Sequence, residues 1–431
     1  MKPKRILFSF CFFLCCSASL LAQQVSNTSR PEDSGFSSER LGRITKLFQS
    51  DIDKGLIPGA VLVVARDGKT VYRQALGFQD REKKTPMKPD TIFRLASMTK
   101  PITSVAVMIL AEEGKIDLLA PVSLYLPEFK DVKVGVEKID PATNKPALSL
   151  ETPRRPMTIQ DLLRHTSGIV YGPFGNTLVH QAYNQANLFD SHQTLAEFVT
   201  KLSKLPLAHQ PGTVFEYGMN IDVLGRIVEV VSGMPFDEFI EERITKPLRM
   251  ADTAFYLSAA QAPRLAELQV DPATGKRPGG TPAEKLTKEN VKWFSGGGGL
   301  LSTSGDYAHF CQMLLNGGEL DGVRLLAPKT VSIMASDQLS PDISRSGFED
   351  LAPTLELGQS FGLGFAVRTH LGPNPVAGSV GDYFWAGIYG TYFWIDPQQK
   401  LFAIMMVQMP FEQSGHYRRA LREQVYAALL H

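Results

Sequence analysis

The spacing of hydrophobic residues changes from helical to strand-like early in the chain. Residues 37–54 place apolar side chains at helical intervals behind a serine that can cap the first turn, which predicts an amphipathic helix. The apolar runs 60–65 and 70–75 then flank a short linker that contains Asp67-Gly68. An Asp-Gly turn between two such runs predicts a β-hairpin.

Strand-like segments return near the end of the chain. Residues 361–367, 383–395 and 401–408 have the alternation of strands, and 396–399 form a hairpin turn between the last two. A final helix is expected over residues 417–430. The sequence therefore predicts a sheet that takes strands from both ends of the chain.

The segment between these strands is mainly helical. Helices are predicted at 157–164, where a capping pattern opens the first turn, at 194–205 and at 221–229. Residues 130–156 are polar and dotted with proline, which indicates a small hairpin or an excursion from the core.

Residues 1–22 have the three-part layout of a secretory signal peptide. Basic residues precede an apolar run at 6–16, and small residues follow it up to Ala22. The apolar run is too short for a comfortable membrane span. Cleavage near Ala22 would leave residues 23–431 as an exported domain, periplasmic or secreted, with Cys311 as its one cysteine and hence no intramolecular disulfide.

The charge balance and the spacing of possible metal ligands argue against several classes of function. The 45 Lys and Arg residues balance 44 Asp and Glu, so no long-range field favours nucleic acid or an anionic membrane. The eight histidines and Cys311 lack the spacing of metal ligands, and no metal or other cofactor is expected. Four glycines at 296–299 precede an expected helix at 306–316 but lack the Gly-Lys-Ser/Thr of a phosphate loop, which favours close backbone packing beside a pocket.

The strongest candidate chemistry lies at Ser97 and Lys100. The two residues are three positions apart, so on a helix they share a face and the amine can lie beside the hydroxyl. A serine nucleophile needs a neighbouring base or a cation that stabilises the alkoxide, and a desolvated lysine can serve as either. If Ser97 begins the helix, its backbone N–H can face an oxyanion. Taken alone, the pattern also fits a capping serine followed by a surface lysine.

The residues around Ser97 resemble the nucleophile region of serine hydrolases of the β-lactamase and penicillin-binding-protein superfamily. The shared features are an aromatic-Arg-x-Ala lead-in, the run from Ser97 through Lys100 to Thr103, and a helix that closes at 112–116. The resemblance extends from about residue 41 to the end of the chain.

This resemblance implies the fold as well. We expect an α/β architecture of the β-lactamase/D,D-peptidase type, with an antiparallel sheet flanked by helices and a mainly helical lobe. The α/β lobe would take about residues 37–103 and 291–431, and the helical lobe about residues 104–290.

Tyr217 matches the second element of the superfamily. It lies on a tight turn before a long helix, a place that also suits a half-buried packing tyrosine. The resemblance implies that its phenol relays a proton between Ser97 and the leaving group. Because a lysine ammonium nearby would favour the phenolate, we expect the pKa of Tyr217 to fall. His165 follows the helix at 157–164, and a structural role is the commoner one for such a histidine.

The remaining elements depart from the penicillin-recognising members. Those enzymes carry asparagine two residues after the tyrosine, where this chain has Met219, and Asn220 comes one residue late. Their third element is Lys-Thr-Gly, whereas this chain has Trp385-Ala386-Gly387, which resembles the W-x-G of the family VIII carboxylesterases.

The third element completes the expected site. Trp385 would offer apolar area and one N–H donor to the substrate, Gly387 would let it approach the strand, and Met219 would line the pocket. The N–H of Ile388 would complete an oxyanion hole with the N–H of Ser97.

The resemblance predicts a carboxylesterase that acts on small-molecule esters or amides through an acyl-Ser97 intermediate. A β-lactamase or D,D-peptidase is the alternative within the superfamily, disfavoured by Met219 and Trp385. A non-catalytic peptidoglycan-binding or sensor protein is the alternative from another class, and the intact Ser97, Lys100 and Tyr217 argue against it. The sequence leaves the oligomeric state open.

Overall fold

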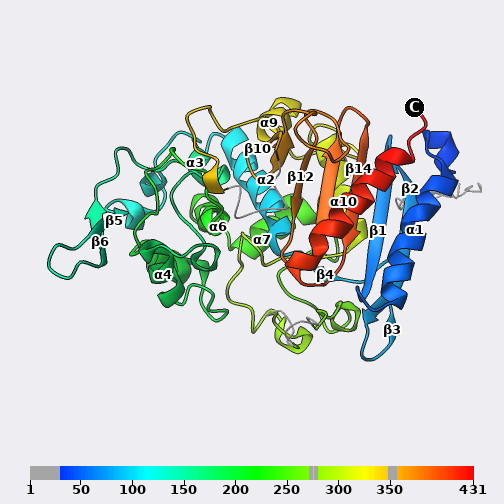
Figure 1. Ribbon diagram of the computed structural model, residues 1–431, viewed down its shortest axis with the longest axis horizontal. Coiled ribbons are helices and arrows are strands. Elements are labelled where there is room, and N and C mark those ends of the chain that lie inside the picture. Colours follow the sequence, from blue (N-terminus) through cyan, green and yellow to red (C-terminus); the bar gives the residue numbers. More distant parts are fainter. Residues whose placement is uncertain (1–29, 271–274, 276–279, 348–356) are drawn as a thin grey trace, which may run out of the picture.

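An eight-stranded antiparallel sheet forms one half of the protein, on the right in Figure 1. The computed structural model describes residues 30–270, 275, 280–347 and 357–431, so the expected signal peptide lies outside the described residues. The antiparallel α/β architecture expected from the sequence is confirmed. In spatial order the strands are β10 (Gln359–Phe361), β11 (Ala366–Arg368), β12 (Tyr383–Ala386), β13 (Tyr392–Asp396), β14 (Leu401–Met406), β1 (Gly59–Arg66), β2 (Lys69–Asp80) and β3 (Thr85–Pro86).

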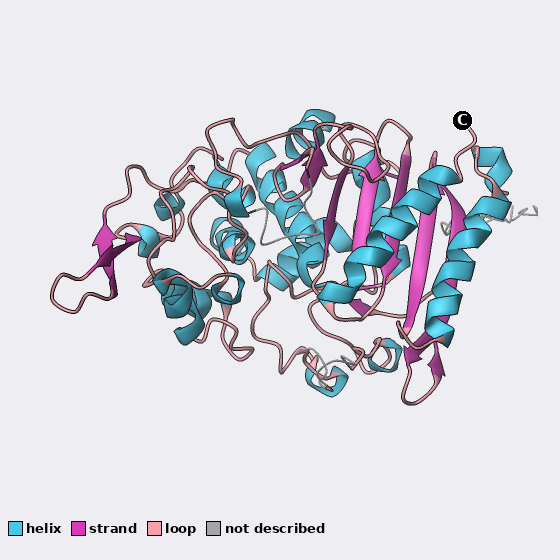
Figure 2. Cartoon of the chain, viewed as in Figure 1, coloured by secondary structure: helices cyan, strands magenta, loops and turns pink. Residues whose placement is uncertain are grey.

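The helices divide between the sheet and the half of the molecule beside it (Figure 2). Those that pack on the sheet are α1 (Ser38–Asp53), α8 (Ser304–Leu315) and α10 (Phe411–Ala427). The others are α2 (Thr99–Glu112), α3 (Ile159–Leu163), α4 (Leu178–Gln185), α5 (Leu195–Leu202), α6 (Asn220–Ser232), α7 (Phe236–Ile240) and α9 (Pro328–Met334). Among the described helices, none combines the length and the apolar composition that crossing a bilayer requires.

The two faces of the sheet are covered by different helices. On β13 the ring of Trp394 lies 6.2 Å from that of Tyr426 on α10, whereas the ring of Phe393 lies 5.1 Å from that of Tyr307 on α8. Successive side chains of a strand point to opposite faces, so α10 and α8 cover the two faces. Burial on both sides explains why the first four residues of the strand are all aromatic or apolar.

Local sequence signals placed several elements correctly. The Ser37 hydroxyl accepts a hydrogen bond from the N–H of Arg40 and caps α1. Asp67 and Gly68 have φ angles of 51° and 75°, as a two-residue hairpin turn between β1 and β2 requires. A reciprocal capping box opens α3. The segment at 130–156 is a hairpin of β5 (Val134–Ile139) and β6 (Pro146–Glu151), which projects at the far left of Figure 1.

Three segments predicted near the chain end have different boundaries in the structure. Residues 361–367 and 383–395 are not single strands, since each is broken by a turn that contains a glycine with positive φ, Gly364 at 93° and Gly390 at 92°. The last helix begins at Phe411, directly after a proline, and ends at Ala427, whereas the sequence predicted residues 417–430. A β-carbon at Gly364 would overlap Ser104, and one at Gly390 would press on Val407 and Met409. The two turns are thus packed against distant segments, which sequence periodicity does not record.

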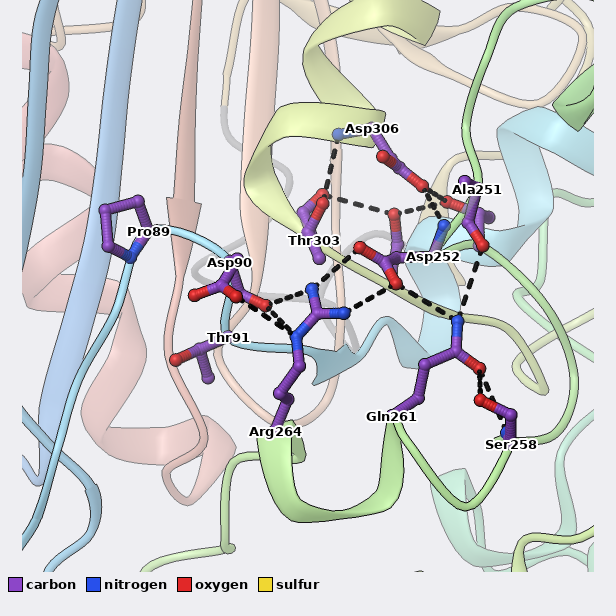
Figure 3. A network of polar contacts seen from close by, with 12 residues as sticks. Pro89, Asp90, Thr91, Ala251, Asp252, Ser258, Gln261, Arg264, Thr303 and Asp306 are labelled. Atoms are coloured by element: carbon purple, nitrogen blue, oxygen red, sulfur yellow. Dashed lines mark hydrogen bonds and ion pairs between the residues drawn. The ribbon is translucent and has the colours of Figure 1, made fainter.

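A polar network fixes the segment that leads into Ser97 (Figure 3). Arg264 donates to both carboxylate oxygens of Asp252 at 2.7 and 2.8 Å and to the carbonyl of Asp90 at 2.6 and 3.0 Å. The N–H of Asp252 donates to Asp306 on α8 at 2.7 Å. Asp90 lies three residues before the strand β4 (Phe93–Arg94), which pairs with β7 (Leu301–Ser302), so the approach to the nucleophile is anchored on two sides.

A buried ion-pair cluster joins the sheet to α10. Asp382 accepts a hydrogen bond from Nε of Arg368 at 3.1 Å and pairs with Arg422 on α10, and all three side chains are buried. Because Asp382 lies directly before β12, the cluster also fixes the strand that carries Trp385.

We expect Asp382→Asn to lower the free energy of unfolding by about 3–5 kcal/mol, because two buried guanidinium groups lose their counter-charge. Urea denaturation measures this loss. The control is Glu39→Gln, which breaks an exposed pair with Arg43 and should change stability by less than about 0.5 kcal/mol. Equal, small effects of the two substitutions would contradict the structural importance of the cluster.

Candidate active site

Ser97 lies on a tight turn at the junction between a strand and a helix. It occupies the centre of a 3-10 turn, Ala96–Met98, that runs directly into α2. Ala96 has a φ of 47°, a left-handed conformation that is costly for a residue with a side chain. The carbonyl of Met98 accepts a hydrogen bond from Tyr307 at 3.0 Å. The turn leaves Ser97 partly exposed between two buried neighbours.

The Lys100 amine lies directly against the Ser97 hydroxyl. Its Nζ is 3.0 Å from Ser97 Oγ, 3.2 Å from Tyr171 Oη and 2.6 Å from the carbonyl oxygen of Gly297. The side chain is fully buried, so these polar atoms replace its water. The helical spacing therefore brings the pair together as the sequence predicts.

The glycine run closes around this amine. A β-carbon at Gly297 would overlap the carboxylate of Asp222, and one at Gly296 would press on the carbonyl of Ile221 in α6. Asp222 accepts the N–H of Gly297 at 3.1 Å and the hydroxyl of Ser295 at 2.5 Å. The run is thus close backbone packing beside the pocket, as the sequence indicates, and it aims a carbonyl at Lys100.

Burial changes the protonation of Lys100. Loss of water lowers the pKa of the Lys100 amine to about 7, although the nearby Asp222 carboxylate opposes the shift. A neutral amine has two N–H donors and one lone pair. These match a carbonyl, a phenol and a hydroxyl proton, which are the three partners of Lys100.

Tyr217 lies beside Ser97 and Lys100 and comes from the mainly helical half of the molecule. Its ring centroid lies 4.7 Å from Lys100 Nζ, and its phenol oxygen accepts a hydrogen bond from Trp385 Nε1 at 3.2 Å. Burial raises the pKa of Tyr217 above its usual value, because it outweighs the hydrogen bonds to Ser97 and Trp385 that favour the phenolate. The expected fall of this pKa is therefore wrong, and Tyr217 rests as a neutral phenol.

Tyr171 is a site residue that the sequence analysis missed. Its hydroxyl is bound to Lys100, and its ring centroid lies 5.5 Å from that of Tyr217. Burial raises its pKa well above the usual tyrosine value. The sequence feature that could have pointed to Tyr171 is its position just after the His165–Gly168 loop, which leads toward the site.

His165 and Asn220 support Tyr217 from behind. The buried ring of His165 lies 4.6 Å from the ring of Tyr217, and its Nδ1 accepts from the N–H of Gly218 at 3.3 Å and from Asn220 Nδ2 at 2.9 Å. Burial and the proximity of Lys100 lower the pKa of His165 well below its usual range, so it stays neutral. Asn220 also accepts from the Ser167 hydroxyl. Its amide is therefore used inside the scaffold.

Two expected substrate contacts are buried. Met219 is 1% exposed and belongs to the hydrophobic core, so its side chain offers no surface to a substrate. Trp385 is 2% exposed, and its N–H is directed at Tyr217 rather than at a bound molecule. The indole therefore positions the phenol.

The turn after β12 lies against the nucleophile. A β-carbon at Gly387 would overlap the carbonyl of Leu95 and approach Ala96 Cβ to 3.3 Å. The carbonyl of Gly387 accepts from buried Arg418 at 3.0 Å, and the next residue, Ile388, is 46% exposed. Among the described residues no acceptor is found for the N–H of Ile388 or of Ser97.

Comparison with known proteins places this geometry in context. A sequence model of the family described as Beta-lactamase matches residues 44–427. Esterase EstB of Burkholderia gladioli is 29% identical over 411 residues, covering 89% of this chain and 95% of EstB. A putative D-alanyl-D-alanine carboxypeptidase of Escherichia coli (strain K12) is 28% identical over 436 residues, covering 94% of this chain and 91% of the relative.

A solved structure with a similar fold also belongs to a hydrolase. EstCE1, described as a hydrolase with promiscuous acyltransferase activity, is 27% identical and superposes with a TM-score of 0.74. The match covers 90% of this chain and 99% of EstCE1. A similarity of this extent concerns the whole fold and not one motif.

We expect Asp222→Asn to lower the pKa of Lys100 below its value of about 7, because the carboxylate that favours the ammonium is removed. The titration of the Lys100 ε-carbon by NMR measures the shift, with Lys100→Arg used to assign the signal. Asp53→Asn, at an exposed position on α1, should leave the titration unchanged. A Lys100 signal that titrates near pH 10 in the unsubstituted protein would contradict the effect of burial.

Proposed function

The chain belongs to the beta-lactamase family, and we propose that it is a carboxylesterase that cleaves small esters through an acyl-Ser97 intermediate. The resemblance found in the sequence is thereby confirmed, as is its implication of a hydrolase. The observation that carries the proposal is the buried Lys100 amine, 3.0 Å from Ser97 Oγ and with a pKa near 7.

Acylation begins with proton transfer from Ser97 to Lys100. The neutral amine accepts the hydroxyl proton while Oγ attacks the ester carbonyl carbon, and the carbonyl electron pair moves onto its oxygen. The N–H groups of Ser97 and Ile388 hold that oxyanion. When the tetrahedral intermediate collapses, the bond to the leaving oxygen breaks and the ester bond to Ser97 remains.

Tyr217 protonates the leaving group. Its raised pKa keeps the proton on the phenol until an alkoxide forms beside it, and the Lys100 ammonium then restores that proton. In deacylation a water gives its proton to Lys100 and attacks the acyl carbon. The carboxylic acid leaves, and Ser97 regains its hydroxyl proton.

Esterase action fits this site better than action on β-lactams. Both ends of the Asn220 amide are occupied by the scaffold, so the contact that penicillin-recognising enzymes make with an asparagine has no counterpart here. Trp385 replaces a lysine that would attract a carboxylate. The carboxypeptidase relative keeps peptide hydrolysis as the second candidate.

We also propose that the chain is exported. Residues 1–22 would act as a cleaved signal peptide, followed by one hydrolase domain at 23–431 with lobes at about 37–103 plus 291–431 and about 104–290. N-terminal sequencing of the protein recovered from the periplasm or medium tests the cleavage near Ala22.

The purified protein should hydrolyse a short p-nitrophenyl ester faster than a chromogenic cephalosporin. A fluorophosphonate probe should label the unsubstituted protein and not Ser97→Ala. Faster turnover of the cephalosporin would favour a β-lactamase or D,D-peptidase. Absence of labelling would favour a non-catalytic binding or sensor protein.

Lys100→Arg should lower kcat/KM for the ester by about 100-fold or more, because arginine keeps the positive charge but cannot accept the Ser97 proton. Lys100→Ala and Tyr217→Phe should also lose acylation while the fold is retained. Lys246→Arg, at an exposed position, is the matched control. Near-wild-type activity of Lys100→Arg would show that the charge of Lys100, and not its basicity, is what matters.

The rate should rise with pH through the Lys100 pKa. Only the neutral amine is active, so kcat/KM should increase about tenfold per pH unit below pH 7 and level off above it. Because the pKa of Tyr217 is raised, ionisation of the phenol should cause no fall below about pH 10. An ascending limb centred near pH 4 would contradict the role of Lys100 as the base.

A further inference from the structure

Each of the two tyrosines at the site carries an exposed phenylalanine on its outer side. The ring of Phe174, 37% exposed, lies nearly parallel to that of Tyr217, with centroids 6.3 Å apart and planes at 13°. The ring of Phe189, 57% exposed, lies in the same relation to Tyr171, at 6.2 Å and 13°. Stacked aromatic surface therefore extends from the two tyrosines beside Lys100 to solvent.

These rings form one continuous surface, which we term the aromatic wall: Tyr217, Phe174, Tyr171, Phe189 and Trp293. Within it, Tyr171 and Phe174 are 5.3 Å apart, and Phe189 and Trp293 are 6.3 Å apart. Trp293 rests on the buried ring of Phe198 in α5 at 5.5 Å. The inner end of the wall touches Lys100, and its outer end is anchored in the core.

The wall is built to stay in place. Phe174 ends a short turn, Gly172–Phe174, in which Pro173 fixes the backbone and the carbonyl of Gly172 accepts from Asn184 at 3.2 Å. A β-carbon at Gly172 would overlap the Asn184 amide, so the turn is packed on α4. The exposed ring is thus preorganised, which limits the entropy lost when a ligand binds.

The carboxylate next to Phe189 is paired with basic side chains. Asp190, next to Phe189, lies 3.5 Å from Lys201 and 3.5 Å from His192. The aromatic wall offers exposed ring area, which favours a flat apolar partner through burial and aromatic contact. Exposed apolar surface that continues into a catalytic pocket is typical of a binding site.

We propose that the aromatic wall is a subsite for a flat apolar group of the substrate, such as an aryl ring, in the alcohol or the acyl part of the ester. The inference rests on the proposed esterase function and adds the substrate class to it. The wall begins at the phenol that protonates the leaving oxygen, so a bound ring lies within reach of the scissile bond.

Three esters assayed by pH-stat test the subsite: ethyl acetate, benzyl acetate and ethyl phenylacetate. In Phe189→Ala and Phe174→Ala, kcat/KM for one aryl ester relative to ethyl acetate should fall about tenfold, mainly through KM. Leu124→Ala removes a side chain of similar exposure (66%) in the turn Val122–Leu124, which contributes no ring to the wall, and should leave the ratio unchanged.

The outcomes separate the two hypotheses. A lower ratio for benzyl acetate assigns the wall to the alcohol part, and a lower ratio for ethyl phenylacetate assigns it to the acyl part. If the unsubstituted protein hydrolyses the esters but the substitutions leave both ratios unchanged, the subsite is refuted and the esterase function stands. If the unsubstituted protein hydrolyses none of the three, the esterase function itself fails.

Discussion

The cost of charging an amine away from water is the constraint on which this site depends. Lys100 is fully buried, and its pKa falls to about 7, so a residue that is normally a cation becomes a base at neutral pH. Burial without partners would be destabilising, and three oxygen atoms, two of them from distant parts of the chain, prevent that. Residues that bear side chains at 296 and 297 could not bring a carbonyl so close, which explains the glycines there.

The sequence was most informative where the cause of structure is local. The cap at Ser37, the Asp67-Gly68 turn and the spacing of Ser97 and Lys100 each depend on neighbours within one helical turn or one hairpin. It was least informative where the cause is packing between distant segments. The breaks at Gly364 and Gly390, the burial of Met219 and Trp385, the pKa direction of Tyr217 and the presence of Tyr171 all depend on such packing.

The burial of Trp385 changes how the third element of the site is understood. An indole that faced the pocket would be one more apolar contact for an ester. Instead its N–H donates to the phenol oxygen of Tyr217, and His165 packs on the ring of that tyrosine. If the proposed function holds, contact with substrate would therefore pass to more exposed groups, which are Tyr171, the two exposed phenylalanines and the turn at Ile388.

The last helix of the chain contacts the turn beside Ser97 through one buried arginine. Arg418 binds the carbonyl of Gly387, and in a planar trans peptide the N–H of the next residue points the opposite way. Fixing that carbonyl therefore orients the N–H of Ile388, and the guanidinium polarises the amide and strengthens it as a donor. A fragment that ends before α10 would keep Ser97, Lys100 and Tyr217 but lose the anchor of this amide. If the Ile388 N–H serves the proposed oxyanion hole, the site would be complete only after the C-terminal helix has been made and docked.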